Sequence, residues 1–328
     1  MNATFPFIRL RRLRYHPLVR QLIRETDLHL KDLILPLFIK GRTGEPKAVA
    51  SMPGHHQIPL SALPQEIEEI ARLGISSVLL FGVPEHKDAL GSDSYSDTGI
   101  IQEAIRVIRS VTSQLLIITD VCFCEYTDHG HCGILTNKDV DNDKTLELLA
   151  RQAASHAKAG ADVVAPSGMI DGAVQAIRAG LDGSGFSHIP IMSYSIKYQS
   201  CLYGPFRAAT EGAPAFGDRS SHQMDTANAR EALREAEHDV NEGADMLMVK
   251  PAHTYLDVIY RVKQAYPHLP LGAYHPSGEF CMIKAAAEKG WLDEKKAAME
   301  ILRSIRRAGA DFIITYYTKE IAAGKWLE

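Results

Sequence analysis

Eight short runs of apolar, often β-branched residues recur along the chain, and helical patterns lie between them. Because the runs are continuously apolar rather than alternating, they are typical of parallel strands that are covered on both faces. Three of them are entered through the same Gly-Ala-Asp sequence, at Gly160, Gly243 and Gly309, where a glycine ends the preceding helix in a left-handed conformation. The predicted strands are Leu33–Phe38, Ser77–Phe81, Leu115–Asp120, Asp162–Pro166, Pro190–Tyr194, Met246–Val249, Pro270–Tyr274 and Phe312–Tyr316.

Amphipathic segments between these runs predict helices. They are Pro64–Leu73, Ile100–Val111, Asp143–Ala159, Thr226–Glu242 and Asp293–Ala308. Strands that alternate with helices in this way predict an α/β fold, a (β/α)₈ TIM barrel. We expect an extended N-terminal arm over residues 1–30 and one catalytic barrel domain over residues 31–328. A doubly wound open sheet is the alternative, but no G-x-G-x-x-G follows the first predicted strand.

Composition excludes several classes of protein. The formal net charge is -4, which argues against a nucleic-acid-binding protein. No apolar run approaches the roughly 18 residues that span a membrane, and the first residues do not resemble a signal peptide. The chain has five cysteines, three of them between 122 and 132, which fits clustered thiols in a reducing cytoplasm better than a disulfide framework.

Two lysines end neighbouring predicted strands. Lys197 follows the fifth run and Lys250 follows the sixth. Burial lowers the pKa of a lysine, and a second ammonium group nearby lowers it further, so either amine could become a nucleophile that forms an imine with a ketone. A lysine that extends its charged end into solvent is the alternative for each residue alone.

Three cysteines follow the third run, at Cys122, Cys124 and Cys132. Three thiolates in so short a loop could bind one Zn²⁺ and leave its fourth position open, as in catalytic zinc sites. Free buried thiols remain an alternative, as does a closed site completed by His129 or His131. We expect Cys201 and Cys281 to be packing residues.

Arg207 and Arg219 flank a glycine- and proline-containing segment after the fifth run. This segment could form a lid, and two guanidinium groups could bind a substrate carboxylate. On residue type alone, an arginine in a polar loop more often forms a surface ion pair.

Several of these segments closely resemble the porphobilinogen synthase family, also called 5-aminolevulinate dehydratases. The resemblance covers nearly the whole chain, and the combination of a three-cysteine loop with two lysines is highly specific. The matching segments are 120–133 with its three cysteines, Met192–Lys197, Tyr203–Arg207, Gly217–Arg219, Met248–Pro251 and Ser277–Glu279.

The resemblance implies a lyase of tetrapyrrole (heme) synthesis. Two molecules of 5-aminolevulinate would condense asymmetrically to porphobilinogen with loss of two waters. By the family pattern, Lys250 holds the propionate-side substrate and Lys197 the acetate-side substrate, while Asp120 has an acid/base or orienting role. The other implied contacts are Arg207 and Arg219 for the acetate-side carboxylate, Ser277 and Tyr316 for the propionate-side carboxylate, Zn²⁺ on the three cysteines, and an allosteric Mg²⁺ on Glu235.

The resemblance also implies a homo-octamer built through contacts between arm and barrel. The chain departs from the family pattern at His222, where the family usually has tyrosine, and at His253, where a small residue is common.

The residues alone leave other functions open. A class I aldolase needs one imine-forming lysine and no zinc. A metal-buffering barrel would bind zinc without forming a substrate adduct. A redox sensor would form a reversible bond between Cys122 and Cys124.

Overall fold

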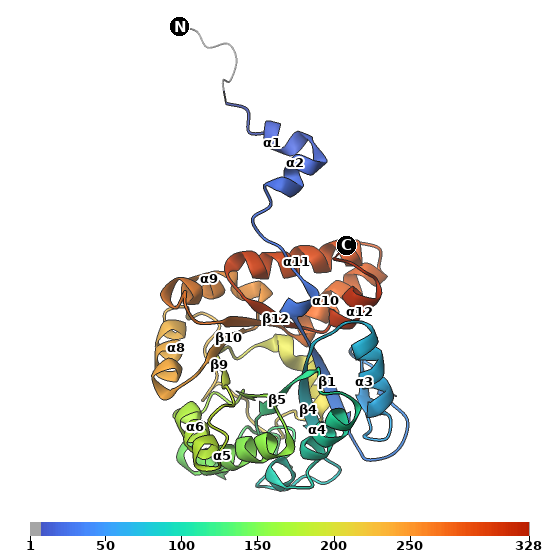
Figure 1. Cartoon of the computed structure of the whole chain (residues 1–328). Helices are drawn as coiled ribbons and strands as arrows, with labels where there is room; N and C mark the ends of the chain where they lie inside the picture. Colours follow the sequence, from blue (N-terminus) through green and yellow to red (C-terminus); the bar gives the residue numbers. More distant parts are fainter. Residues whose placement is uncertain (1–7, 328) are drawn as a thin grey trace.

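Eight parallel strands form a nearly closed ring in the computed structural model, which describes residues 8–327 (Figure 1). The strand order is β8-β5-β4-β1-β12-β11-β10-β9, and a bridge between Val164 and Ile191 joins the two ends. The TIM-barrel prediction is therefore confirmed, and an open doubly wound sheet is excluded because its edge strands would not meet. The barrel strands are β1 (Leu33–Lys40), β4 (Ser77–Val83), β5 (Leu116–Val121), β8 (Val163–Pro166), β9 (Met192–Lys197), β10 (Met246–Lys250), β11 (Leu271–His275) and β12 (Phe312–Thr315).

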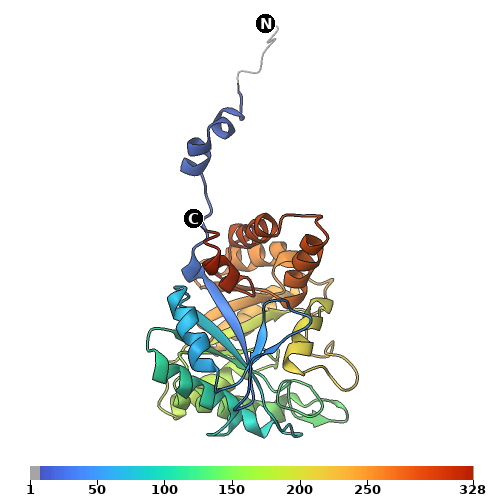
Figure 2. The same cartoon turned by 90° about the vertical axis from the view of Figure 1, so that its right-hand side faces the viewer.

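Helices surround the ring on its outside (Figures 1 and 2). They are α3 (Leu63–Arg72), α4 (Ile100–Val111), α5 (Asn142–Ala159), α6 (Ala173–Gly183), α7 (Gly204–Thr210), α8 (Glu231–Glu242), α9 (Leu256–Ala265), α10 (Ser277–Glu288), α11 (Glu294–Ala308) and α12 (Thr318–Ala323). Two small hairpins decorate the loops after β1 and β5: β2 (Lys47–Ala48) with β3 (His56–Ile58), and β6 (Leu135–Thr136) with β7 (Asp139–Val140).

The helix predicted over Thr226–Glu242 was too long. The observed helix α8 begins only at Glu231. Before it, the carboxylate of Asp225 accepts a hydrogen bond from the backbone N–H of Ala227 at 2.8 Å and holds the chain in a turn. A short aspartate side chain that bonds its own backbone competes with helix formation in this way.

The three Gly-Ala-Asp corners have the same geometry. Gly160, Gly243 and Gly309 have φ between 105° and 121°, where a side chain would be strained. The aspartate two residues after each glycine accepts a hydrogen bond from a backbone N–H group at the start of the neighbouring strand. These bonds are Ile117 N–H to Asp162 at 2.7 Å, Ile191 N–H to Asp245 at 2.8 Å and Leu271 N–H to Asp311 at 2.8 Å. The three aspartates therefore connect adjacent strands by hydrogen bonds at the end of the barrel where the strands begin.

An arm precedes the barrel and projects away from it (Figures 1 and 2). It contains α1 (Arg12–Tyr15) and α2 (Pro17–Leu22), and its large apolar side chains are exposed. The first seven residues of the predicted arm lie outside the described residues. Within residues 8–327, no helix combines the length and the apolar character that crossing a bilayer requires.

Candidate active site

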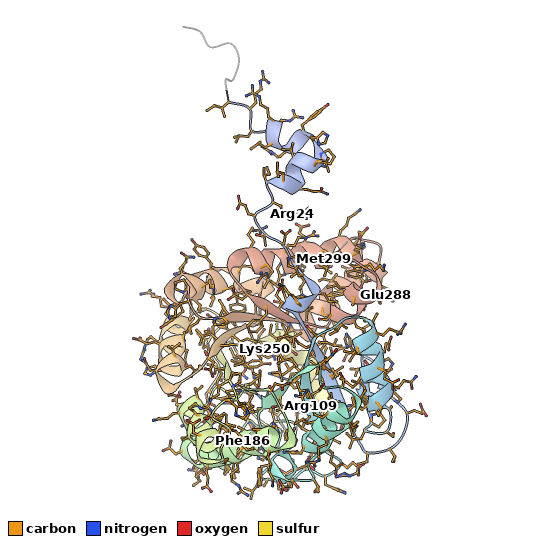
Figure 3. The ribbon with its side chains drawn as sticks, in the orientation of Figure 1. Arg24, Arg109, Phe186, Lys250, Glu288 and Met299 are labelled. Carbon is orange, nitrogen blue, oxygen red and sulfur yellow. The ribbon has the colours of Figure 1, made fainter. Side chains whose placement is uncertain are left out.

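Both candidate lysines lie at the same rim of the barrel. Lys197 is the last residue of β9 and Lys250 the last residue of β10, and the two are direct partners in the register of these strands. Their exposed fractions are only 5% and 4%. In the stick view Lys250 lies in the middle of the ring, whereas Arg109 and Met299 lie on the surrounding helices (Figure 3). The strands thus bring two buried amines together, as the sequence predicted.

Aromatic rings surround the amine of Lys250. Its Nζ lies 4.0 Å from the ring centroid of Tyr274, 5.0 Å from that of Phe206 and 5.1 Å from that of Tyr203. Burial, and then repulsion by Lys197, lower the pKa of Lys250 to about 7. A large fraction of this side chain is consequently a neutral, nucleophilic amine near neutral pH.

Polar groups surround Lys197 instead. Its Nζ donates a hydrogen bond to the backbone carbonyl of Ser167, at the end of β8. Asp120 is the second-last residue of β5 and is 6% exposed. Burial, and then the nearby Glu125, raise the pKa of its carboxyl group, while Lys197 partly opposes that rise. The carboxyl group of Asp120 and the amine of Lys197 therefore interact electrostatically.

The three cysteines of the loop after β5 form one compact group. Cys122, Cys124 and Cys132 are at most 3% exposed, and their sulfur atoms all lie within 4.8 Å of one another. The sulfurs of Cys122 and Cys124 are 3.4 Å apart, and both cysteines are free thiols. This separation suits ligands of one ion, so the group could hold a metal.

Neither candidate histidine joins this group within residues 8–327. The Nε2 atom of His129 contacts the carbonyl of Ala89, and that of His131 contacts the carbonyl of Phe216. The closed site with a histidine as fourth ligand is thus not supported by the geometry.

Two polar residues of the site were missed by the sequence analysis. Glu125 is 2% exposed, lies with Asp120 and Cys122 in a second group of possible ligand atoms within 4.8 Å, and leaves Oε2 without a partner. Burial, and then Cys124, raise the pKa of Glu125 to about 8. Gln223 is 4% exposed, and neither atom of its amide has a partner. A buried amide of this kind is costly unless a ligand satisfies it.

The two predicted arginines approach the same region from the segment after β9. Arg207 lies on α7 and is half-buried, while Arg219 is 3% exposed and donates hydrogen bonds to the carbonyls of Gly130 and Gly212 at 2.9 and 2.8 Å. Each leaves its Nε buried without a partner. Burial, and then repulsion by Arg219, lower the pKa of Arg207, so the two guanidinium groups lie near enough to interact electrostatically.

Ser277 and Tyr316 are each connected to Lys250 through one aromatic residue. Ser277 begins α10, and its hydroxyl accepts a hydrogen bond from Phe206 N–H at 2.9 Å. The hydroxyl of Tyr316 lies 3.0 Å from that of Tyr274. Because the rings of Phe206 and Tyr274 border the amine of Lys250, both predicted contacts fall on the Lys250 side.

Glu235 lies outside this centre, on α8. It lines a cavity of about 490 Å³ together with other carboxylates, and burial followed by Asp171 raises its pKa to about 7. The other acidic residues that line the cavity are Asp171, Glu231, Asp239 and Glu242.

The prediction that Cys201 packs in the core was wrong. Cys201 is exposed because it lies in a single turn of 3₁₀ helix at the surface. Cys281 is partly buried, and its thiol donates to the carbonyl of Ser51 at 3.0 Å. His222, which stands where the family usually has tyrosine, is half-buried near Lys197. Burial, and then Lys197, lower the pKa of this histidine to about 4.

Known proteins resemble this chain over nearly its whole length. The profile of the delta-aminolevulinic acid dehydratase family matches residues 7–324. The enzyme of that name from Halalkalibacterium halodurans is 52% identical over 327 residues, covering 100% of this chain and 99% of the relative. That of Archaeoglobus fulgidus is 52% identical over 320 residues and covers 98% of each chain.

A solved structure has the same fold. Delta-aminolevulinic acid dehydratase (porphobilinogen synthase) from Toxoplasma gondii ME49, in complex with the reaction product porphobilinogen, superposes with a TM-score of 0.94 at 42% identity, covering 97% of this chain and 91% of that one. Together with the family profile and the bacterial and archaeal relatives, this match shows that the chain belongs to the delta-aminolevulinic acid dehydratase family.

Proposed function

We propose that this chain condenses two molecules of 5-aminolevulinate to one molecule of porphobilinogen and two of water. The names of its relatives and the product in the Toxoplasma structure support this reaction. The observation that carries the proposal is the pair of buried lysines in direct register, Lys197 and Lys250, because two ketone substrates can each be held by one amine.

The reaction begins with imine formation. The neutral amine of Lys250 attacks the ketone carbon of one substrate, and the carbonyl oxygen leaves as water after proton transfer. Lys197 binds the second substrate in the same way, and Asp120, whose carboxyl group interacts electrostatically with this amine, accepts or returns its proton. One carbon–carbon and one carbon–nitrogen bond then join the substrates, and each lysine is released as a free amine.

Two sets of donors hold the two substrate carboxylates. Ser277 and Tyr316 serve the substrate on Lys250, because both connect to the aromatic wall around that amine. Arg207 and Arg219 serve the substrate on Lys197. A carboxylate there would satisfy their unpartnered Nε groups and relieve the repulsion between the half-buried Arg207 and the buried Arg219. Gln223 would find in the same ligand a partner for its buried amide.

The cluster of three cysteine thiols fits a zinc ion. Cys122, Cys124 and Cys132 would hold it, since three buried sulfurs of this spacing match a soft, tetrahedral cation rather than Mg²⁺. Zinc bound there would supply Lewis-acid polarisation of a substrate group. Glu125 and Asp120 lie against the same group and would orient a substrate amine through their free carboxylate oxygens.

Mg²⁺ would bind at a second place, on Glu235. Burial, and then the surrounding carboxylates, raise the pKa of Glu235, and a hard divalent cation bound there would relieve the repulsion between these carboxylates. The exposed apolar side chains of the arm favour self-association of residues 1–30 with the barrel of another copy, and a homo-octamer is the assembly we propose. We place the enzyme in the cytoplasm, where its free thiols stay reduced.

Incubation with 5-aminolevulinate tests the reaction. We expect a pyrrole that colours with an aldehyde reagent, and we expect a strong zinc chelator to abolish it. Borohydride added with the substrate should reduce an imine, and mass spectrometry should locate the adduct on Lys250. A coloured product without any lysine adduct would refute the imine mechanism, and an adduct without pyrrole would point to an aldolase.

A further inference from the structure

A buried carboxyl–imidazole pair lies behind the candidate site and has no role in the reaction described above. Glu279, in the first turn of α10, is 3% exposed, and His275, the last residue of β11, is fully buried. The Nε2 atom of His275 and the Oε2 atom of Glu279 are 3.9 Å apart, and neither has a hydrogen-bond partner. Burying two such groups costs free energy, so their presence calls for a physical reason.

Glu279 connects its helix to the segment that follows Lys250. Its Oε1 atom accepts hydrogen bonds from the backbone N–H groups of His253 at 2.8 Å and of Thr254 at 3.3 Å. Only Pro251 and Ala252 separate His253 from the lysine. A movement of the Glu279 carboxylate would therefore be transmitted to the end of β10.

His275 continues the connection in the other direction. Its Nδ1 atom lies 3.2 Å from the hydroxyl of Thr315, the last residue of β12, and Thr315 is fully buried. The imidazole ring also stacks on Tyr317, with ring centroids 6.2 Å apart. The contacts of Glu279 and His275 thus reach the carboxyl ends of β10, β11 and β12, although the two side chains face each other at 3.9 Å without a hydrogen bond.

These three strand ends carry the candidate residues of one substrate position. Lys250 ends β10, Ser277 lies between His275 and Glu279, and Tyr316 directly follows Thr315. Within residues 8–327, no hydrogen bond joins Lys197 to Glu279 or His275. Lys197 is linked to them only through its register partner Lys250, and its other neighbours come from β5, β8 and the segment after β9. The contacts of Glu279 and His275 therefore reach the Lys250 half of the site directly and the Lys197 half only through Lys250.

We propose that Glu279 and His275 are positioning residues for the Lys250 half of the reaction. They hold the ends of three strands so that the amine of Lys250, the hydroxyl of Ser277 and the phenol of Tyr316 converge on one substrate molecule. Neither touches the substrate. This inference rests on the proposed function, since it assumes that Lys250 forms an imine.

Site-selective trapping separates positioning from stability. Each variant is mixed with 5-aminolevulinate and borohydride, and the initial rates of adduct formation at Lys250 and at Lys197 are measured by mass spectrometry. In Glu279→Ala we expect the Lys250 rate to fall by about 100-fold, the loss that a misplacement of about 1 Å can cause, while the Lys197 rate stays within about twofold. Glu279→Gln should recover most of the Lys250 rate, because its amide oxygen can accept the same two N–H groups.

Asp162→Ala is the matched control. It also removes a carboxylate that accepts a backbone N–H, that of Ile117 at 2.7 Å, but it does so at the opposite end of the barrel. It should lower the melting temperature without changing the ratio of the two trapping rates. If Glu279→Ala does not fold, Glu279→Asp provides the same comparison, because its shorter carboxylate cannot reach both partners.

Two outcomes would overturn the proposal: an equal loss at both lysines, or an unchanged ratio in a folded Glu279 variant. Failure of the proposed function gives a different result, because the unsubstituted protein would then form no adduct at Lys250 at all.

Discussion

Replacing Lys250 with methionine should stabilise the folded barrel at neutral pH while abolishing product formation. Methionine fills a similar volume among Tyr274, Phe206 and Tyr203 without a group that must be charged or desolvated. The lysine, by contrast, loses its hydration on folding, and this loss lowers its pKa from 10.5 to about 7. The same free energy that makes the amine nucleophilic therefore opposes folding.

The size of this effect follows from proton linkage. Lowering the pKa of Lys250 from 10.5 to about 7 corresponds to a free energy of about 5 kcal/mol, at about 1.4 kcal/mol for each pKa unit. Between these values the unfolded chain binds more protons than the folded chain, so the stability of the unsubstituted protein rises with pH. Its free energy of unfolding should be lower than that of the variant by about 4 kcal/mol at pH 7 and by about 2 kcal/mol at pH 9.

Urea unfolding at pH 7 and pH 9 measures the difference directly, with the variant and the parent compared in the same assembly state. Lys295→Met, at an exposed position on α11, is the control and should show no such change with pH. A gap between Lys250→Met and the parent that is equal at both pH values would refute the reasoning. It would mean that Lys250 is as well hydrated in the folded barrel as in the unfolded chain.

The other expectations concern the two metals and the carboxylate contacts. Cys132→Ser should lose bound zinc and turnover together, measured by metal analysis and by the pyrrole assay; full activity without zinc would exclude the three-cysteine site. Arg207→Lys should raise KM by about tenfold, because an ammonium group cannot form the paired hydrogen bonds of a guanidinium group. An unchanged KM would show that Arg207 does not bind the substrate carboxylate. Glu235→Gln should abolish any stimulation by Mg²⁺ while keeping the basal rate, and persistent stimulation would place the ion elsewhere.

The barrel could be predicted because its strands are buried on both faces. After Ser77, a strand such as β4 contains no polar residue, so its position can be predicted from the uninterrupted run of apolar residues in the sequence. Helix α10 was missed for the opposite reason. It begins with Ser277 and Gly278, which resemble a turn, yet glycine is required there because a Cβ atom would lie 2.6 Å from the backbone of Leu202. That requirement arises from tertiary packing and leaves no periodic signal.

The lysines and cysteines could also be predicted, since each is chemically unusual where it stands: a cation that ends an apolar strand, or three thiols in one loop. Glu125 and Gln223 could not. A glutamate beside a cysteine or a glutamine in a polar loop is ordinary by type and spacing, and each becomes significant only when the fold buries it without a partner. Among the described residues, burial combined with an unpartnered polar atom was the signal that the sequence lacked.

The two lysines differ in their surroundings although their strands are adjacent, and this difference bears on how one barrel can treat two identical substrates differently. Lys250 is enclosed by aromatic rings, and burial, followed by repulsion from Lys197, disfavours its ammonium form and favours attack on a ketone. Lys197 lies between a backbone carbonyl, a carboxyl group and the thiol cluster, where charged groups and a cation can be accommodated. An apolar half and a polar half thus arise from the neighbours that the barrel topology assigns to consecutive strands, so the asymmetry of the condensation needs no second domain.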